Sequence, residues 1–330
     1  MHAVVVDSSG QLSWQEVPDL RPGPSEVLIK VAAAGVNRAD LLQAAGHYPP
    51  PPGASDILGM EASGVIAELG EDVAGWSVGQ EVTALLAGGG YAEFVAAPAP
   101  QVMPVPDGIG LVAAAALPEV ACTVWSNLVM TANLIQGQTL LIHGGASGVG
   151  THAIQVARQL GARTAVTAGS QTKLDLARDL GAEIAINYRE TDFVAALHEQ
   201  TNGAGADVVL DIIGAKYLDR NIDALAPDGQ LIVIGLQGGT TGELNLGKLM
   251  TKRARVIGTA LRGRPIDGSH SKGEIARQVV VHVWPMIAEG RVRPMVGAEF
   301  DIRQAGDAHK LLSSGDVTGK VILRVGPSTQ

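Results

Sequence analysis

The feature that most constrains the fold is an alternation of short apolar runs with helix-like segments between residues 119 and 285. Near-continuous apolar strands that alternate with helices are typical of a parallel sheet covered on both faces. Six such runs match the doubly wound, mononucleotide-binding pattern of an α/β fold. They occupy residues 139–143, 163–168, 183–187, 207–213, 230–235 and 255–260.

The first third of the chain has a different pattern. Residues 1–118 contain short β-branched runs separated by Gly and Pro, which predict an antiparallel sheet or a small barrel. Short strands return after residue 285, so we expect the tail to rejoin the first domain. The expected layout is a discontinuous catalytic domain, 1–118 and 286–330, with a nucleotide-binding domain, 119–285, inserted. Residues 47–53, HYPPPPG, are expected to form an ordered loop, because proline lacks an amide donor.

The segment HGGASGVGTHA, residues 143–153, joins the first of the six runs to a helical pattern. A helix that begins there directs unpaired N–H groups and a positive dipole end at its ligand, most often a pyrophosphate. Gly145, Gly148 and Gly150 match the G-x-G-x-x-G motif imperfectly, because Ser147 replaces a middle glycine. A tight turn without a ligand is the alternative, but the position in the strand–helix series favours a dinucleotide.

The residues after the second run indicate which dinucleotide binds. NAD-binding folds usually carry an acid there for the ribose 2′-hydroxyl, but none occurs from Thr151 to Leu174. Ser170 and Lys173 offer a hydroxyl and an ammonium, which suit a 2′-phosphate, and Tyr188 is placed to close the same pocket. A solvated Lys173 is the alternative. NADP(H) is therefore the expected cofactor.

Four segments resemble the medium-chain dehydrogenase/reductase superfamily: AAAGVNRADLLQAAGHYPPPPG, LGMEASGVIAELG, LLIHGGASGVGTHAIQVAR and VTAGSQTKLDLARDLGA. More narrowly, they resemble its zinc-independent NADPH quinone oxidoreductases of the tumour-suppressor-inducible type. The resemblance implies a GroES-like β-barrel catalytic domain with an inserted Rossmann domain. This agrees with the layout expected above.

The zinc ligands of related alcohol dehydrogenases are replaced in this sequence. Asn37 and Met60 stand where the resemblance places the catalytic Cys and His, and an amide and a thioether are poor Zn²⁺ ligands. Cys122 is the single cysteine, so a four-cysteine zinc lobe cannot form. We expect no metal, and the role of Glu61, beside the absent zinc, stays open.

The resemblance also implies the site residues. Tyr48 is the expected substrate-facing tyrosine, and Ser147, Asn37 and Asp40 are the other expected catalytic or pocket residues. Packing of Tyr48 on prolines and a helix-capping role for Ser147 or Asp40 are the alternatives. The expected cofactor-binding positions are Thr123, Gly145, Ala146, Ser147, Gly148, Val149, Gly150, Gly169, Ser170, Lys173, Tyr188, Leu236 and Leu261.

The function expected from the resemblance is an NADPH:quinone oxidoreductase that acts on small quinones. An enoyl or 2-alkenal reductase with the same cofactor is a second hypothesis. A catalytically silent NADPH-binding sensor or RNA-binding protein is the third, motivated by a basic, acid-free stretch at 244–266. The net charge of −9 disfavours nucleic acid as a partner.

The remaining expectations concern location and assembly. The N-terminus lacks the pattern of a signal peptide, and no apolar run approaches the ~18 residues needed to cross a bilayer. We therefore expect a cytoplasmic protein without a membrane partner. A homodimer is expected from the resemblance alone.

Overall fold

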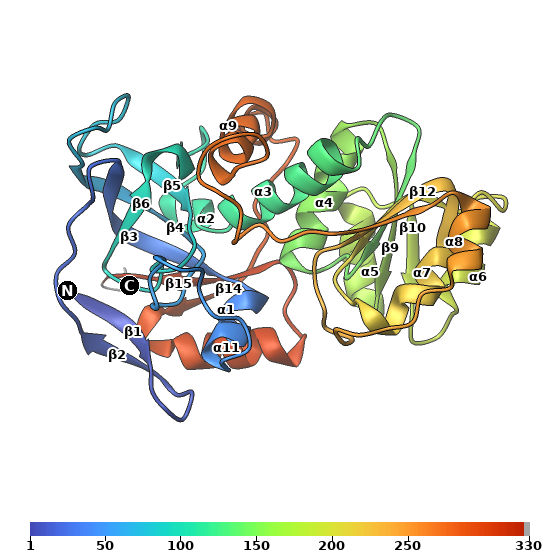
Figure 1. Ribbon diagram of the computed structural model, residues 1–330, viewed down its shortest axis with the longest axis horizontal. Coiled ribbons are helices and arrows are strands. Elements are labelled where there is room, and N and C mark those ends of the chain that lie inside the picture. The colour runs from blue at the N-terminus through green and yellow to red at the C-terminus, as the bar shows by residue number, and fades with distance from the viewer. Residues whose placement is uncertain (327–330) are drawn as a thin grey trace. The chain divides into compact units, whose positions relative to one another are not determined.

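The computed structural model describes residues 1–326, which form two compact units (Figure 1). Unit 1 comprises Met1–Thr123 and the chain from Leu261 onward, and unit 2 comprises Val124–Ala260. These units differ from the expected domains, because residues 119–123 and 261–285 belong to unit 1. Residues 261–285 belong to unit 1 because α9 (Lys272–His282) packs against η1 (Ala99–Gln101) and β7 (Val102–Pro104) of that unit.

Unit 2 is built on a six-stranded sheet in which all strands are parallel. Its strands are β8 (Thr139–His143), β9 (Arg163–Ala168), β10 (Ile184–Asn187), β11 (Ala206–Asp211), β12 (Leu225–Val233) and β13 (Arg255–Gly258). The order β10-β9-β8-β11-β12-β13 is the 3-2-1-4-5-6 order of a doubly wound Rossmann sheet. The expected α/β fold class is confirmed.

Helices connect these strands and pack on the sheet (Figure 1). They are α4 (Gly148–Gln159), α5 (Gln171–Asp179), α6 (Phe193–Gln200), α7 (Leu218–Ala224) and α8 (Leu246–Lys252), with η2 (Ser126–Thr131) before β8 and η3 (Ala215–Tyr217) before α7. Gly161 and Gly181 have φ of +73° and +110° just after α4 and α5. Glycine tolerates this left-handed conformation, which explains the Leu-Gly-Ala helix stops.

Unit 1 contains a seven-stranded sheet and a separate hairpin, β1 (His2–Val6) with β2 (Leu12–Glu16). The sheet runs β14-β15-β3-β4-β5-β7, and β6 also pairs with β3. The strands not yet located are β3 (Glu26–Val36), β4 (Glu61–Leu69), β5 (Glu81–Leu85), β6 (Phe94–Pro98), β14 (Val296–Asp301) and β15 (Lys320–Arg324). Because β15 pairs antiparallel with β3, the C-terminal segment completes the N-terminal sheet.

The helices of unit 1 surround this sheet. They are α1 (Arg38–Ala44), α2 (Leu111–Ala114), α3 (Pro118–Trp125), α9, α10 (Trp284–Ala288), η4 (Ile302–Gln304) and α11 (Ala305–Ser314), with α3 running on into unit 2. Residues 47–53 contain no helix or strand, as expected. The apolar core of the unit includes Val27, Ile29, Ala62 and Ile66, each at most 1% exposed.

One helical stretch corrects an expectation from the sequence. Leu111–Thr131 has the length and mean hydropathy of a membrane-spanning helix, although no such run was expected. Pro118 and Glu119 interrupt its apolar run, although the mean hydropathy of the whole stretch stays high. Because 78% of its most apolar window is buried in the fold, it resembles the core helix of a globular protein.

Candidate active site

The glycine-rich turn links β8 to α4 in unit 2. Ser147 is the N-cap of α4, and its Oγ accepts a hydrogen bond from the Gly150 N–H at 3.1 Å. A Cβ on Gly150 would lie 2.2 Å from the Gly144 carbonyl oxygen, and one on Gly145 would lie 2.7 Å from Val166 Cβ. Gly144, which the sequence did not single out, has φ +75°. Gly150 is therefore required by close backbone packing, Gly145 by contact with the Val166 side chain and Gly144 by its left-handed conformation, and the capping interpretation of Ser147 is confirmed.

The N-terminus of α4 has the properties of a phosphate site. Its first turn contains no acidic residue, and the first N–H groups of a helix lack intrahelical acceptors. Ala146 and Val149 flank the start of this helix, the former buried and the latter half-buried. The turn fits a pyrophosphate because the dipole and the N–H groups both favour an anion there.

A second set of polar groups gathers where β9 ends. A Cβ on Gly169 would lie 2.7 Å from the Tyr188 hydroxyl and 3.0 Å from Arg189 Nε, so both side chains lie over this glycine. Ser170 precedes α5 without making a side-chain cap hydrogen bond, and Lys173 is half-buried in the first turn. Arg189 was not predicted from the sequence, although it directly follows Tyr188, because Glu190 and Asp192 come next and give the segment no basic character.

The other expected cofactor positions are distributed over both units. Leu236 follows β12 in unit 2 and is 53% exposed. Thr123 and Leu261 belong to unit 1, and each is 9% exposed. Thr123 Oγ1 lies 3.4 Å from Glu119 Oε1 within α3. Their contact with a cofactor stays a prediction.

In unit 1, a buried polar network surrounds Asn37. The Asn37 Nδ2 group donates to Glu61 Oε1 at 2.8 Å, and Asn37 Oδ1 accepts from Lys320 Nζ at 2.6 Å. Lys320 also forms an ion pair with Glu61 at 2.5 Å and donates to the Val36 carbonyl at 3.1 Å. The second Glu61 oxygen accepts from the Glu119 N–H at 2.9 Å. Both atoms of the Asn37 amide are therefore engaged, and Glu61 acts as the counterion of a buried lysine.

The position expected of a zinc-binding His is occupied by Met60, which is 1% exposed in the core. Among residues 1–326, no three His, Cys, Asp or Glu side chains gather as a metal-binding group. The polar side chains at this place bind one another, so their chemistry does not provide the ligand set that Zn²⁺ requires.

Asp40 lies at the start of α1 and is completely buried. Its carboxylate accepts from the Asn37 N–H at 2.7 Å, the Gly59 N–H at 3.1 Å and the Tyr91 hydroxyl at 3.2 Å. The Tyr91 oxygen also lies 3.2 Å from His309 Nε2. Burial raises the pKa of Asp40 to about 6, against the lowering effect of these N–H donors and of Lys320. The helix-capping alternative describes what Asp40 does, and a catalytic role stays a prediction.

Tyr48 is half-buried in the proline-rich loop, and the Arg262 guanidinium carbon lies 5.2 Å from the centre of its ring. No hydrogen-bond partner of the Tyr48 hydroxyl is found within residues 1–326, so this group is available to a ligand. Burial raises the pKa of Tyr48, while Arg262 opposes the shift. Burial also raises the pKa of Glu119 to about 8, and the Glu61 carboxylate adds to this effect.

The basic stretch that the sequence singled out is paired with acidic residues in the fold. The acid-free stretch at 244–266 is not acid-free in space: Lys248 pairs with Asp219 and Asp223, and Arg253 pairs with Asp228.

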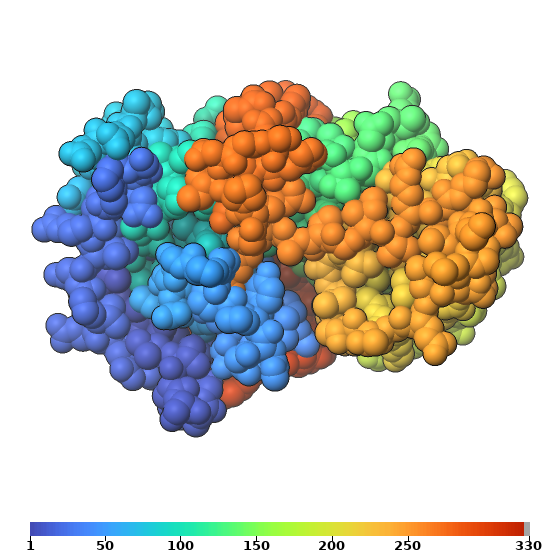
Figure 2. Space-filling model, viewed as in Figure 1, coloured from blue at the N-terminus to red at the C-terminus, as the bar shows by residue number. Residues whose placement is uncertain are grey.

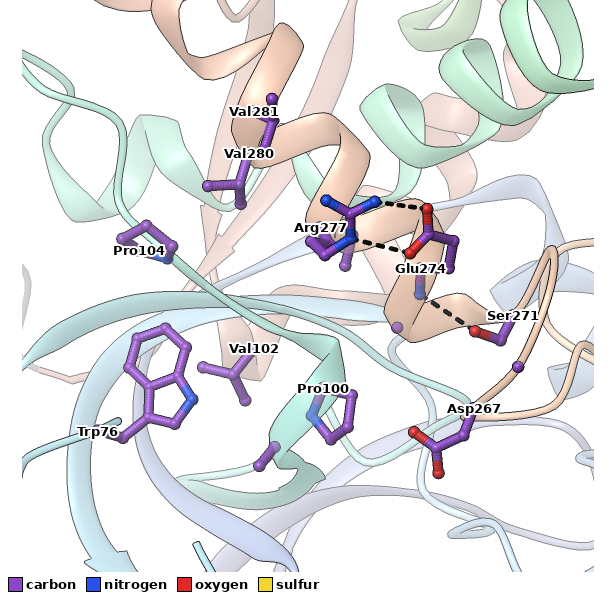
Figure 3. Close-up of a pocket in the computed structure, with 14 residues that line it drawn as sticks. Trp76, Pro100, Val102, Pro104, Asp267, Ser271, Glu274, Arg277, Val280 and Val281 are labelled. Atoms are coloured by element: carbon purple, nitrogen blue, oxygen red, sulfur yellow. Dashed lines mark hydrogen bonds and ion pairs between the residues drawn. The ribbon is translucent and has the colours of Figure 1, made fainter. Parts of the chain in front are cut away.

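A hollow of about 500 Å³ in unit 1 lies between α9 and the η1–β7 segment (Figure 3). It contains none of the expected site residues.

Two family models match the chain: "Alcohol dehydrogenase GroES-like domain" over residues 23–107 and "Zinc-binding dehydrogenase" over residues 148–276. The quinone oxidoreductase of Pseudomonas aeruginosa is 31% identical over 315 residues, which cover 94% of this chain and 95% of that protein. A phenolphthiocerol/phthiocerol polyketide synthase component of Mycobacterium tuberculosis is 31% identical over 327 residues, or 97% of this chain. The chain spans only 14% of the length of that synthase polypeptide.

Solved structures of a quinone oxidoreductase and of an enoyl reductase also resemble this chain. The Escherichia coli quinone oxidoreductase complexed with NADPH has a TM-score of 0.87 and 29% identity, covering 98% of each chain. The CurK enoyl reductase has a TM-score of 0.85 and 26% identity, covering 98% of this chain and 99% of its own. The GroES-like and Rossmann folds are therefore both confirmed.

Proposed function

The chain belongs to the medium-chain dehydrogenase/reductase superfamily, and from this premise we propose that it is a zinc-independent NADPH:quinone oxidoreductase. The observation that carries the proposal is the network of Asn37, Glu61 and Lys320. The resemblance places Asn37 and Glu61 where zinc-dependent relatives hold their metal, and in this network both atoms of the Asn37 amide are engaged. Carbonyl activation must then come from hydrogen-bond donors and charge.

NADP(H) is the cofactor, and the residues of unit 2 fit it in two places. The N-terminus of α4 would hold the pyrophosphate. Ser170, Lys173, Tyr188 and Arg189 would hold the 2′-phosphate, since hydroxyl, ammonium and guanidinium groups suit a doubly charged anion. When bound, NADPH supplies the hydride.

Tyr48 supports the chemistry at the acceptor. Its hydroxyl lacks a partner within residues 1–326 and belongs to a loop held by Arg262. We assign it the donation of a hydrogen bond, and then a proton, to the acceptor oxygen as hydride arrives. Asn37 and Thr123 are proposed to line the same site, and Ser147 orients α4 through its cap.

Reduction of an enoyl thioester or a 2-alkenal is a second candidate. It is supported by the similarity to a polyketide synthase component and to the CurK enoyl reductase. A quinone and an activated alkene share a conjugated carbonyl, so the same donors serve both. The sensor or RNA-binding hypothesis is weakened, because Lys248 and Arg253 of the basic stretch are paired with carboxylates.

NADPH oxidation against a panel of acceptors separates these functions. The panel contains 1,2-naphthoquinone, 9,10-phenanthrenequinone, crotonyl thioester and a 2-alkenal, with NADH in parallel. Turnover with the quinones supports the proposal, and turnover with only the thioester or the alkenal supports the second candidate. Binding of NADPH without any turnover would contradict both and favour a sensor.

A homodimer is also proposed, through the edge of the unit 2 sheet. Within residues 1–326, β13 pairs only with β12, which leaves its other edge open. Leu246 and Met250 of α8 are 62% and 76% exposed, and Val256 of β13 is 37% exposed. An open edge strand readily pairs with another chain. Light scattering should give twice the monomer mass, and a monomer at every concentration would contradict this.

A further inference from the structure

Two cationic side chains of unit 1 are buried without a carboxylate partner. Arg262 is 4% exposed and Lys272 is 6% exposed, yet every acceptor that their nitrogen atoms contact within residues 1–326 is neutral. Lys320, which is also buried in unit 1, pairs with Glu61. Burying an uncompensated charge is costly, so the positions of Arg262 and Lys272 require an explanation beyond packing.

Arg262 connects three separate segments of unit 1. Its Nε donates to the Ala87 carbonyl at 2.7 Å, Nη1 to the Tyr48 carbonyl at 3.2 Å, and Nη2 to Gln43 Oε1 at 2.6 Å. Gln43 in turn donates through Nε2 to the Asp56 carbonyl at 2.9 Å. The guanidinium therefore holds the start of the proline-rich loop directly and the chain just after the loop through Gln43. Figure 2 shows the blue segment that follows α1 against the orange segment that leads to α9.

The sequence of this loop explains why an external donor is needed. Residues 49–52 are four prolines, so the loop has no backbone N–H at four consecutive positions. Its carbonyls are held by the Ala54 N–H, which donates to the Pro51 carbonyl at 3.0 Å, and by Arg262, which donates to the Tyr48 carbonyl. A guanidinium offers five N–H donors in a rigid plane, which suits several carbonyls at once.

Lys272 holds Arg262 in turn. Its Nζ donates to the Arg262 carbonyl at 3.2 Å, and its own N–H donates to the Pro265 carbonyl at 2.9 Å. Lys272 is the first residue of α9, which Ser271 caps. The segment that carries Arg262 is thus closed by a second buried cation rather than by a carboxylate.

The charged groups around Tyr48 come from several elements. Glu119 of α3 and Arg262 act on its hydroxyl in opposite directions, and Asp40 and Lys272 act on Arg262. The pKa of Glu119 is raised to about 8, so this carboxyl carries little charge at neutral pH. The guanidinium is therefore the dominant charge at the tyrosine.

We propose that Arg262 is a positioning residue of the acceptor site, which fixes the Tyr48 segment and supplies the positive charge that favours the anion formed on the acceptor. This inference depends on the proposed function, in which Tyr48 faces the acceptor. When hydride adds to a quinone or an activated alkene, its electron pair leaves a negative charge on the carbonyl oxygen. That oxygen takes a proton from Tyr48, which solvent then reprotonates.

The first test measures the ionisation of Tyr48 without any turnover. The chain has four tyrosines, so protein that contains fluorinated tyrosine gives four ¹⁹F signals, and Tyr48→Phe identifies the relevant one. Arg262→Met should raise the pH at which this signal titrates by about one unit, because a nearby cation favours the phenolate. Arg262→Lys should leave it unchanged. Arg264→Met is the matched control: Arg264 lies two positions after Arg262, and within residues 1–326 its side chain donates only to the His270 carbonyl.

An unchanged titration in Arg262→Met, or an equal shift in Arg264→Met, would overturn the electrostatic role. This readout does not need an acceptor, so the acceptor panel can fail while the coupling between Arg262 and Tyr48 is still measured.

The second test is kinetic. Arg262→Met should lower kcat at least tenfold with KM for NADPH unchanged, and its loss and that of Tyr48→Phe should be less than additive in the double variant. If Arg262→Met does not fold, Arg262→Lys decides alone: its single ammonium cannot reach all three acceptors, so kcat should fall at least tenfold. A wild-type kcat in Arg262→Lys, or independent losses in the double variant, would overturn the positioning role.

Discussion

At the scale of single residues, the amide of Asn37 bonds to both members of a buried ion pair in the interior of unit 1. It donates to Glu61 and accepts from Lys320, which also contact each other directly. Lys320 directs its ammonium at three acceptors, Glu61, Asn37 and the Val36 carbonyl, which matches its three N–H groups. The network is saturated, so the loss of one member leaves another member buried without its partner.

We therefore expect Lys320→Met to destabilise the fold by about 3–5 kcal/mol, because it leaves the Glu61 carboxylate buried and unpaired. Lys310→Met is the control: Lys310 is 81% exposed and pairs with Asp307, so a change below about 0.5 kcal/mol is expected. Urea unfolding measures both. Adding Glu61→Gln to Lys320→Met should restore part of the loss, and equal effects of Lys320→Met and Lys310→Met would contradict the account.

The 2′-phosphate site gives the second prediction at this scale. Lys173→Ala and Arg189→Ala should each weaken NADPH binding by about 2 kcal/mol, roughly thirtyfold, because each removes a charge-assisted hydrogen bond. Binding of NADH, which lacks the phosphate, should be nearly unchanged. Calorimetry with both nucleotides measures the difference. Equal losses for NADPH and NADH would place these side chains elsewhere.

The sequence could predict part of this chemistry. Ser170, Lys173 and Tyr188 follow strand ends, and parallel strands bring their carboxyl ends to one edge of a sheet, so a common site for them could be predicted. Lys320 lies 283 positions after Asn37, and no pattern in the sequence connects them. Arg262 was assigned to a basic stretch because its neighbours in sequence are basic, whereas its neighbours in space are carbonyls.

At the scale of elements, β8, the glycine turn and α4 form one strand–turn–helix motif. Gly150 lets α4 start against the backbone of Gly144, at a distance where a Cβ would lie 2.2 Å from the carbonyl oxygen. The strands before and after this turn and helix, β8 and β9, were predictable because buried parallel strands are short and continuously apolar. The predicted ranges 139–143 and 163–168 equal β8 and β9.

Gly150→Ala should destabilise unit 2 by about 1–3 kcal/mol, because the methyl group must push α4 away from rigid backbone. The shift should also weaken NADPH binding. Gly306→Ala is the control: it lies in α11 with nothing within 4 Å of its Cβ position, so the protein should be equally stable or more stable by up to about 1 kcal/mol. Thermal unfolding compares them, and a neutral Gly150→Ala would contradict the tight packing.

Elements that depend on distant contacts were not predictable. The chain after Leu261 resembles the end of a nucleotide-binding domain in sequence, but α9 packs on β7 and η1 in unit 1. Trp284 confirms this placement, since its Nε1 donates to the Pro104 carbonyl at 2.7 Å. Such a change of unit leaves no local signal, because the segments that α9 packs against, η1 and β7, are remote from it in the sequence.

At the scale of the whole molecule, a raised carboxyl pKa makes stability depend on pH. Glu119 has a pKa of about 8 in the fold against an ordinary value of 4.5. The fold therefore binds this proton more tightly than the unfolded chain does. Its contribution to stability is complete below about pH 4.5 and is lost as the pH rises through about 8.

Glu119→Gln should remove this dependence. The variant should gain about 1–2 kcal/mol relative to the wild type between pH 5 and pH 9, after allowance for solvent screening of a partly exposed group. Urea unfolding at a series of pH values gives the two curves. Parallel curves would show that Glu119 ionises normally in the fold.

The central claim is that the molecule reduces quinones with NADPH and without a metal. The most direct measurement is quinone-dependent NADPH oxidation by protein dialysed against a strong chelator, with its zinc content measured on the same sample. We predict full turnover, with NADPH preferred over NADH, at a zinc content far below one ion per chain. Activity that disappears on dialysis and returns with added Zn²⁺ would contradict the account, because Asn37 and Met60 would then be compatible with a catalytic metal.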